Sequence, residues 1–338
     1  MTATAPAADG RTCSRLSVIT PAYNEEENLP DLYERLRTVL DSIAVEWEWI
    51  VIDDHSSDRT FEISAGLAQR DRRIRALRFS RNFGSHAGVS CGLRIARGDC
   101  AVVLAADLQD PPEIIPQLLA AWRNGTQVVW AVRDKRLGEN TATLKTSGLF
   151  YWIMRNVIGM RELAPTGADF FLIDRCVIEA YRGFDERNIN IFALLAWMGF
   201  RQETVGYTKE PRLHGSSGWT FKKKLKLAVD SITAFSYLPV RFMSWTGVLT
   251  AIAGFIYAMF VIANAVRGQP VEGWSSLMVI VMVIGGFQML MLGVLGEYVW
   301  RGLDEARRRP RYTIEATTPG DSEVELSDVP MARAIRAS

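Results

Sequence analysis

Short apolar runs alternate with longer amphipathic stretches over roughly the first 130 residues of the chain. The runs are rich in β-branched and aromatic residues, as buried strands are, and they cover residues 16–20, 47–53, 74–79, 101–106 and 128–132. The stretches between them place apolar residues three and four apart, as helices do, and they cover residues 28–43, 59–70, 86–96 and 113–122. This alternation predicts an α/β domain whose mostly parallel sheet is covered by helices on both faces.

Two long apolar runs lie in the last third of the chain. Residues 242–266 and 277–296 contain no Asp, Glu, Lys, Arg or His over 25 and 20 residues. A bilayer core needs ~20 apolar residues per helix, so both runs are long enough to span it. Helices buried in a soluble core are usually shorter and less uniformly apolar. The pattern therefore predicts a transmembrane hairpin.

Basic residues lie at the outer ends of this hairpin. Only Arg267 falls between the two runs, whereas ten lysines and arginines flank them: Lys222, Lys223, Lys224, Lys226, Arg241, Arg301, Arg307, Arg308, Arg309 and Arg311. The positive-inside rule then places both termini in the cytoplasm, which predicts a multi-pass protein of the inner or plasma membrane.

The segment 219–237 mixes lysines with aromatic and aliphatic residues. This composition is typical of a helix at the membrane interface that attracts lipid headgroups. Lysines that only set the orientation of the hairpin would give the same pattern. Small residues in the second run would let helices approach closely, either within the hairpin or in a homo-oligomer; they are Gly285, Gly286, Gly293 and Gly296.

The overall charge and the cysteine spacing argue against two classes of function. A net charge of +1 does not fit a dedicated nucleic-acid binder, which carries a basic domain or face. The cysteines show no C-x-x-C spacing, so they are expected to be reduced and structural rather than zinc or redox ligands. They are Cys13, Cys91, Cys100 and Cys176.

Polar loops follow four of the predicted strands. Their sequences are PAYNEEEN, DDHSSD, SRNFGSH and DLQDPPE. Because the carboxyl ends of parallel strands meet at one edge of a sheet, these loops are expected to form a ligand site there. Each loop also has an ordinary explanation, since Asn24 and Asp58 suit helix N-caps and Pro111 and Pro112 suit a helix start. Four such loops at one edge favour the ligand site.

The last of these loops offers two oxygen ligands. Asp107 and Gln109 lie two residues apart around a sharp turn, so both side chains could point the same way. Mg²⁺ and Mn²⁺ bind through one or two carboxylates, with substrate phosphates completing the shell. The loop therefore suggests a metal-bound nucleotide diphosphate.

Six ordered motifs resemble the family 2 glycosyltransferases of the GT-A fold, and more closely the polyprenyl-phosphate glycosyltransferases related to dolichol-phosphate mannose synthase. The resemblance covers residues 15–311, including the apolar hairpin. The motifs are TPAYNEEENL, VIDDHSSDRT, SRNFGSHAGVSCGL, ADLQDPPE, GADFFLIDR and ERNINIFALLAWMGFRQ. An ordered set followed by a membrane hairpin is far more specific than any single motif.

This resemblance implies roles for individual residues. Those for the nucleotide-sugar are Pro21, Tyr23, Glu25, Asp53, Asp54, Arg81, Asn82 and Gly84. Asp107 and Gln109 match the metal-binding positions, and Asp169 matches the acid beside the reacting centre, so Asp107 and Asp169 are expected to be catalytic. The residues for the acceptor phosphate are Arg133, Lys145 and Arg212.

Three positions depart from the family pattern. Many relatives have Asp-Ala-Asp where this chain reads Ala-Ala-Asp, so Ala105 replaces an acid. Many have Asp-Phe-Arg around the catalytic acid, where this chain has Phe171 instead of arginine. Relatives often place a lysine near the glycines at 215–218, whereas the next lysine here is Lys222. These changes suggest a subgroup with a different donor, or weakened catalysis.

The resemblance implies a membrane-bound inverting enzyme that moves a sugar from a nucleotide-diphosphate sugar, expected to be a UDP-sugar, to a polyprenyl phosphate for cell-surface glycan or lipid modification. Expected segments are a flexible tail (1–14), the transferase domain (15–210), a juxtamembrane segment (211–240), the hairpin (241–300) and a basic, then flexible tail (301–338). A different acceptor or a non-catalytic nucleotide-sugar binding protein are alternatives. A processive synthase would need more spans and a Gln-x-x-Arg-Trp motif, which this chain lacks.

Overall fold

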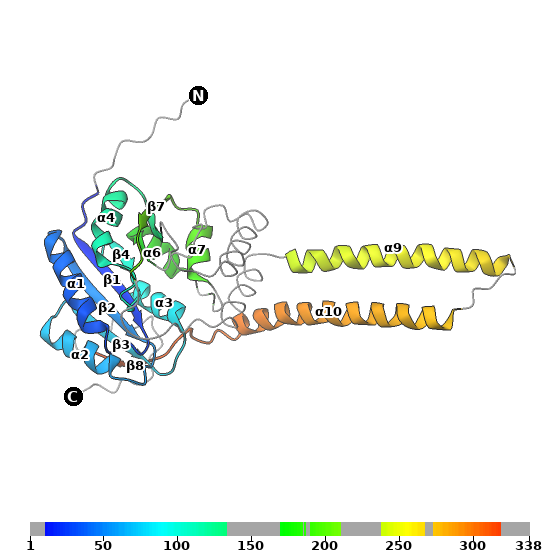
Figure 1. Ribbon diagram of the computed structural model, residues 1–338, viewed down its shortest axis with the longest axis horizontal. Helices are drawn as coiled ribbons and strands as arrows, with labels where there is room; N and C mark the ends of the chain where they lie inside the picture. Colours follow the sequence, from blue (N-terminus) through cyan, green and yellow to red (C-terminus); the bar gives the residue numbers. More distant parts are fainter. Residues whose placement is uncertain are drawn as a thin grey trace, which may run out of the picture. The chain divides into compact units, whose positions relative to one another are not determined.

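The computed structural model describes residues 11–133, 170–184, 186, 190–210, 238–267 and 273–318 (Figure 1). Two compact units make up the chain. The first joins Met1–Leu227 to Pro310–Ser338, and the second is Ala228–Arg309. Three predicted site residues, Lys145, Asp169 and Arg212, lie outside the described residues, as does the segment 219–237.

The first unit is built on an eight-stranded sheet in the order β7-β5-β6-β4-β1-β2-β3-β8. Its strands are β1 (Arg15–Ala22), β2 (Glu46–Asp53), β3 (Ile74–Phe79), β4 (Cys100–Val103), β5 (Val128–Arg133), β6 (Phe171–Asp174), β7 (Gln202–Tyr207) and β8 (Ile314–Thr317). Its α-helices are α1 (Leu29–Ser42), α2 (Thr60–Arg70), α3 (Ser85–Ile95), α4 (Ile115–Arg123), α6 (Arg175–Arg182) and α7 (Ile191–Trp197), with a 3₁₀ turn, η1, at Pro112–Ile114.

Strands β4, β1, β2 and β3 are parallel neighbours, and β5 is parallel to β7. Strand β6 runs antiparallel to both β4 and β5, and β8 runs antiparallel to β3. The predicted α/β fold with a mostly parallel sheet is confirmed. The strand predicted over 101–106 is wrong at its end, because ladder pairing stops at Val103, although the Leu104 amide still donates to the Ile19 carbonyl at 3.0 Å.

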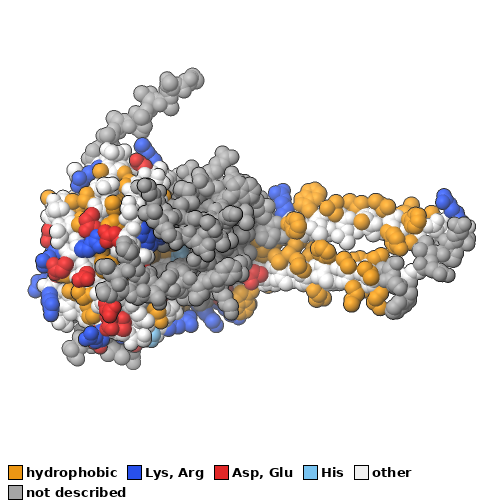
Figure 2. Space-filling model, viewed as in Figure 1, with side chains coloured by type: hydrophobic (Ala, Val, Ile, Leu, Met, Phe, Trp, Pro, Cys, Tyr) orange, Lys and Arg blue, Asp and Glu red, His pale blue; other side chains and the backbone are white. Residues whose placement is uncertain are grey.

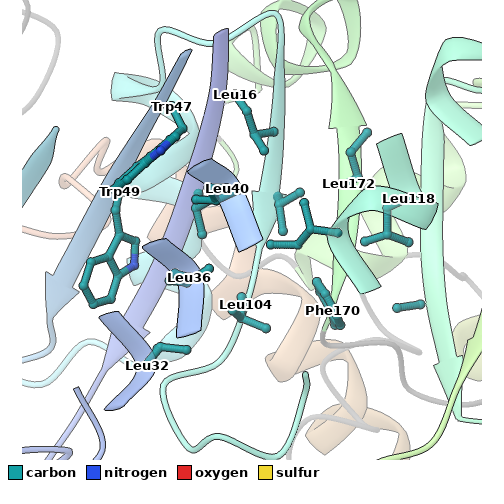
Figure 3. Close-up of a cluster of buried hydrophobic side chains, with 14 of the residues drawn as sticks. Leu16, Leu32, Leu36, Leu40, Trp47, Trp49, Leu104, Leu118, Phe170 and Leu172 are labelled. Atoms are coloured by element: carbon teal, nitrogen blue, oxygen red, sulfur yellow. The ribbon is translucent and has the colours of Figure 1, made fainter. Parts of the chain in front are cut away.

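The two faces of β1 carry different helices because successive side chains of a strand point to opposite sides. On one face Leu16 and Val18 join a buried cluster with four leucines of α1 and with Trp47 and Trp49 of β2 (Figure 3). The α1 leucines lie three or four residues apart: Leu29, Leu32, Leu36 and Leu40. Each buried leucine contributes about 1.5–3 kcal/mol, so this stripe holds α1 to the sheet.

On the other face α3 lies so close to β1 that two of its positions must be glycine. A Cβ at Gly92 would lie 2.2 Å from Ile19 Cγ2, and one at Gly88 would lie 2.9 Å from Pro21 Cβ. Both distances are shorter than real Cβ contacts. The glycines therefore fix the N-terminal end of α3 next to the end of β1, where the first polar loop begins.

The second unit contains α9 (Leu238–Val266) and α10 (Trp274–Ala306). The segments Val240–Asn264 and Leu277–Ala306 have mean hydropathies of 2.0 and 2.4 and are exposed along their length; apolar side chains are visible along both helices (Figure 2). Helices of a soluble core would be buried, and signal sequences lie near the N-terminus. Both helices are therefore long and apolar enough to cross a membrane, and both predicted runs fall within them.

The described C-terminal part of the chain contains regular structure. Residues 301–338, expected as a basic and then flexible tail, include the end of α10 and all of β8.

The four cysteines are free thiols, as the sequence predicts. A Cβ added to any of the four small residues of α10 would meet nothing within 4 Å, so these glycines do not support close packing within the described hairpin. The homo-oligomer stays a prediction.

Candidate active site

The sheet brings the four polar loops to a single edge. Strands β4, β1, β2 and β3 are adjacent and parallel, so their carboxyl ends lie side by side. Strand β5 runs in the same direction as β4, because both are antiparallel to β6. Arg133 at the end of β5 and Phe171 at the start of β6 therefore lie at this same edge.

Each of the four loops contains one residue in the left-handed region of backbone conformation. The φ angles are 57° at Asn24, 60° at His55, 91° at Gly84 and 56° at Leu108. Leucine is rarely found there, at a cost of roughly 1–2 kcal/mol. Leu108 is nevertheless held, because its side chain is buried in the core with only 1% exposed. Such strain is concentrated at functional sites, and here it lies between Asp107 and Gln109.

Hydrogen bonds join the first two loops into one rigid piece. The Asn24 carboxamide oxygen accepts from the Ser57 amide at 2.9 Å, and the Asn24 amide donates to Ser56 Oγ at 2.9 Å. The Glu25 amide donates to Thr60 Oγ1 at 2.8 Å. Asn24 therefore links loops rather than capping a helix.

Asp54 joins the second loop to the third. Its carboxylate accepts from the Phe83 amide at 2.6 Å and the Gly84 amide at 2.8 Å. Burial raises the pKa of Asp54 to about 6, although the two amide donors oppose this shift. Both carboxylate oxygens are thus engaged by backbone, so Asp54 shapes the loop at the N-terminus of α3.

Asp53 lies at the end of β2 with a different set of contacts. Its Oδ1 accepts from the Ser56 amide at 3.0 Å. Its Oδ2 is buried and has no hydrogen-bond partner among the described residues, with Arg78 Nε 3.5 Å away. Burial raises the pKa of Asp53, against the pull of the Ser56 hydrogen bonds and of Arg78. An unsatisfied buried carboxylate oxygen requires an explanation, and a bound ligand is one.

The other predicted donor residues differ in exposure. Tyr23 is 49% exposed, and the exposed Arg81 lies over the Phe83 ring with its guanidinium carbon 4.6 Å from the ring centroid. Asn82 is exposed beside it. The Glu25 carboxylate accepts from Asn28 Nδ2 at 2.5 Å. The loops thus present an aromatic ring and a guanidinium to solvent at the carboxyl edge of the sheet.

The loop after β4 is braced on both sides. The Tyr207 hydroxyl donates to Asp110, and the Glu210 amide donates to the Gln109 carbonyl at 2.9 Å. Arg35 of α1 donates to both oxygens of Glu113, at 3.1 and 2.7 Å. These contacts hold the strained turn between Asp107 and Gln109.

Asp107 is 9% exposed, and its Oδ1 accepts from the Gln109 amide at 3.3 Å. The described part of the chain contains no group of three or more His, Cys, Asp or Glu able to hold a metal by themselves. One carboxylate and one amide oxygen on a fixed turn fit Mg²⁺ or Mn²⁺ whose remaining ligands come from a substrate diphosphate. The donor set therefore fits the predicted cation.

Arg133 and Phe171 differ in what they offer a substrate. Arg133 bonds to Tyr207, and this contact opposes the strong rise that burial causes in the pKa of the Tyr207 hydroxyl. Phe171, which stands where many relatives have arginine, is fully buried, and its ring centroid lies 5.2 Å from that of Trp130 and 5.9 Å from that of Phe192. The replacement thus fills the core with an apolar side chain.

Acidic loops at the carboxyl edge of a parallel sheet, an oxygen-ligand turn and two exposed apolar helices together define a membrane-attached transferase of the GT-A fold. Residues 17–181 match the model of "Glycosyl transferase family 2". The chain belongs to this family of glycosyltransferases.

Its relatives include proteins of similar length. "Uncharacterized glycosyltransferase YkcC" of Bacillus subtilis is 38% identical over 88% of this chain and 93% of its own. The "SfII prophage-derived bactoprenol glucosyl transferase" of Shigella flexneri is 35% identical over 91% of this chain and 99% of its own. The crystal structure of mannosyl-3-phosphoglycerate synthase from Rubrobacter xylanophilus is 15% identical over 69% of this chain and 75% of that one, with a TM-score of 0.46.

Proposed function

We propose that this protein transfers a sugar from a nucleotide-diphosphate sugar to a polyprenyl phosphate at the cytoplasmic face of a membrane. The proposal rests mainly on one observation: the chain combines four polar loops at one edge of the sheet with two exposed apolar helices. A lipid carrier keeps its phosphate at the bilayer surface, so its transferase must be held there. Shigella relatives named bactoprenol glucosyl transferases, which this chain matches over 91% of its length, support this acceptor.

In this proposal the acceptor needs little help from a general base. A phosphate monoester is largely ionised at pH 7, because its second pKa is about 6. Its oxygen forms a bond to the anomeric carbon while the bond from that carbon to the donor diphosphate breaks. The electron pair leaves with the nucleoside diphosphate, and the anomeric configuration inverts. The work of the protein is to position both substrates and to stabilise the separating charges.

The residues of the edge divide this work. Tyr23, Asp53 and Arg81 would contact the nucleoside, with Asp54 fixing the loop that borders it. Asp107 and Gln109 would hold Mg²⁺ or Mn²⁺, which would act as a Lewis acid toward the departing diphosphate. Asp169 would face the sugar, where the transition state resembles an oxocarbenium ion as in glycoside hydrolysis.

Basic residues would bind the acceptor side. Arg133, Lys145 and Arg212 would contact the acceptor phosphate, and the lysines of segment 219–237 would attract anionic headgroups at ~1 kcal/mol each near the surface. With both termini cytoplasmic, these groups and the donor loops would lie on the same side of the membrane.

A transfer assay with a donor panel tests the proposal. The full chain in detergent is incubated with undecaprenyl phosphate and labelled UDP- or GDP-sugars, with Mg²⁺, Mn²⁺ or EDTA. We expect one donor to label the lipid in the presence of a divalent cation and EDTA to abolish the reaction. If no donor labels the lipid under any metal condition, the transferase proposal is wrong.

A non-catalytic nucleotide-sugar binding protein is the second candidate. It is favoured by Ala105, which stands where many relatives have an acid, and by the burial of Phe171. Equilibrium binding in the same samples separates the two. Saturable binding of a nucleotide without any transfer to lipid would support the second candidate.

A further inference from the structure

The chain returns to the sheet after the membrane helices. Strand β8 pairs antiparallel with β3 through Leu77 and Phe79. Thr318 continues the contact, since its amide donates to the Ala76 carbonyl at 3.0 Å and its Oγ1 accepts from the Ala76 amide at 3.0 Å. Strand β3 ends at one of the four polar loops, so β8 is the outer neighbour of the proposed donor site.

Two residues just before β8 anchor it firmly. Arg311 donates to the Tyr181 hydroxyl at 3.0 Å and to the Phe184 carbonyl at 2.9 Å. Tyr312 is 2% exposed, and its ring stacks on Phe79 with the centroids 5.0 Å apart. This returning segment, Arg311–Thr318, is therefore an integral part of the first unit.

Glu315 of this segment lies beside charged groups near the ends of β2 and β3. Its Oε2 lies 3.5 Å from Arg78 Nε and 3.5 Å from His55 Nδ1. Arg78 Nε is also 3.5 Å from Asp53 Oδ2. His55 Nδ1 lies 3.0 Å from the Phe79 carbonyl, which it can bond by donating, and Arg78 Nη2 donates to the Ser56 carbonyl at 3.1 Å. One guanidinium thus stands between two carboxylates.

Three atoms of this group lack a hydrogen bond. Asp53 Oδ2, Arg78 Nε and Glu315 Oε2 are all buried without a partner in the described parts of the chain. Arg78 Nε has a single hydrogen to donate, and both carboxylate oxygens lie at the same 3.5 Å from it. If Arg78 bonds Glu315, Asp53 Oδ2 is left to accept from something else. Leaving it empty is costly, because an unsatisfied buried acceptor costs about 1–3 kcal/mol.

We propose that Glu315 is a positioning residue for the nucleotide: it holds Arg78 away from Asp53, so that Asp53 Oδ2 accepts a hydrogen bond from the nucleoside half of the donor. The inference rests on the proposed function, since it takes Asp53 as the nucleoside contact. It extends the site to a strand that lies beyond both membrane helices in the sequence. Without the Glu315 charge, Arg78 closes on Asp53 and competes with the nucleoside.

Binding of UDP and of GDP, each with Mg²⁺, to the full chain in detergent tests this inference by calorimetry. For the nucleotide that binds, Glu315→Gln should raise Kd about fivefold, which corresponds to about 1 kcal/mol. At saturating donor its kcat should stay within about twofold, since Glu315 does not touch the reacting atoms. Glu46→Gln is the matched control: Glu46 also lies 3.5 Å from an arginine, Arg15, but at the opposite end of the sheet, and its Kd should not change.

A second pair of variants tests the route through Arg78. In an Arg78→Gln background, Glu315→Gln should have no further effect on Kd, because the group that it restrains is gone. An equal effect in both backgrounds would overturn the inference. So would an unchanged Kd in the single variant, or a fall in kcat and melting temperature with Kd unchanged, which would indicate a merely structural strand.

The outcome for the wild type keeps the two proposals separate. If the wild-type protein binds neither UDP nor GDP, the nucleotide-sugar function itself fails, and with it the inference. If it binds one of them and Glu315→Gln binds it equally well, only the role of Glu315 is wrong.

Discussion

Strand β2 carries two buried carboxylates, Glu48 and Asp53, toward its opposite ends, and their surroundings differ. Glu48 Oε1 accepts from the Ser17 hydroxyl at 2.6 Å and the Arg97 amide at 2.7 Å, and Oε2 accepts from Arg75 Nη1 at 3.1 Å. Asp53 has one oxygen bonded and one without a partner among the described residues. The same strand thus contributes a carboxylate with both oxygens bonded near one end, and near the other end a carboxylate with only one.

The difference has a physical meaning. A buried ion pair with all its oxygens bonded offsets much of its desolvation energy. A buried acceptor without a hydrogen bond instead destabilises the ligand-free protein. Proteins keep such a cost where a ligand removes it. The contrast between Glu48 and Asp53 therefore separates residues that serve the fold from residues that serve the substrate, and each prediction below tests that separation.

The largest expected effect on stability comes from Glu48, whose carboxylate oxygens are both bonded. Glu48→Ala should lower the free energy of unfolding by about 3–5 kcal/mol, because it leaves Arg75, 5% exposed, buried without its carboxylate. The melting temperature in detergent should fall by about 10 °C. The exposed Glu46 of the same strand provides the control, since Glu46→Gln should leave it unchanged. A Glu48→Ala protein as stable as the wild type would contradict the assignment.

The largest effect on activity comes from the strained turn. Asp107→Asn should lower kcat about 100-fold, equivalent to about 2.7 kcal/mol of activation free energy, because an amide binds a divalent cation far more weakly than a carboxylate does. The melting temperature should hardly change. Asp41→Asn, which alters an exposed aspartate paired with Arg73 at 2.8 Å, should keep full transfer of label to lipid. Full metal-dependent activity in Asp107→Asn would show that Asp107 is not a ligand.

Asp53 is the direct counterpart of Glu48. Asp53→Asn should raise the Kd of the bound nucleoside diphosphate about tenfold, or about 1.4 kcal/mol, because the charged acceptor is lost. Its melting temperature should equal or exceed that of the wild type, since a desolvated charge is removed. Calorimetry and thermal melting in parallel check both points. A fall in stability like that of Glu48→Ala would contradict the different roles assigned to Asp53 and Glu48.

The smallest effect is a dependence of stability on pH at Asp54. Burial raises its pKa from 3.8 to about 6 in the folded protein. The folded state therefore holds the proton more tightly than the unfolded state, so the contribution is complete below about pH 4 and is lost as pH rises through 6. Compared with the wild type, Asp54→Asn should gain in relative melting temperature between pH 4 and pH 7. If the melting temperatures of Asp54→Asn and of the wild type change with pH in the same way across this range, the raised pKa of Asp54 is ruled out.

The sequence predicts the part of the fold that has a clear period. Strands β1, β2, β3 and β5 and helices α1 to α4 follow from their apolar spacing, and the hairpin follows from two uncharged runs. Strands β6 and β8 have four residues each and lie beyond the alternating pattern of the first 130 residues. The partner of β8 also lies more than 230 residues earlier in the sequence, and no local pattern reports such a pairing.

The site divides in the same way. Its loops could be located, because polar residues after strands are visible in the sequence. The different tasks of Asp53 and Asp54 could not be predicted, because they depend on which atoms the neighbouring loops present: the Phe83 and Gly84 amides donate to Asp54, whereas one oxygen of Asp53 has no such donor among the described residues. Glu315 and Arg78 carry no motif at all, and only the sheet brings them together.

The return of β8 to the sheet also orders the biosynthesis of the protein. The ribosome makes β1 to β7 first, then both membrane helices, and only afterwards the strand that covers the edge of β3. Until β8 has been synthesised, that edge stays unpaired, and unpaired edges invite association with other chains. The first unit of this protein therefore completes its sheet only after both apolar helices of the second unit have been synthesised.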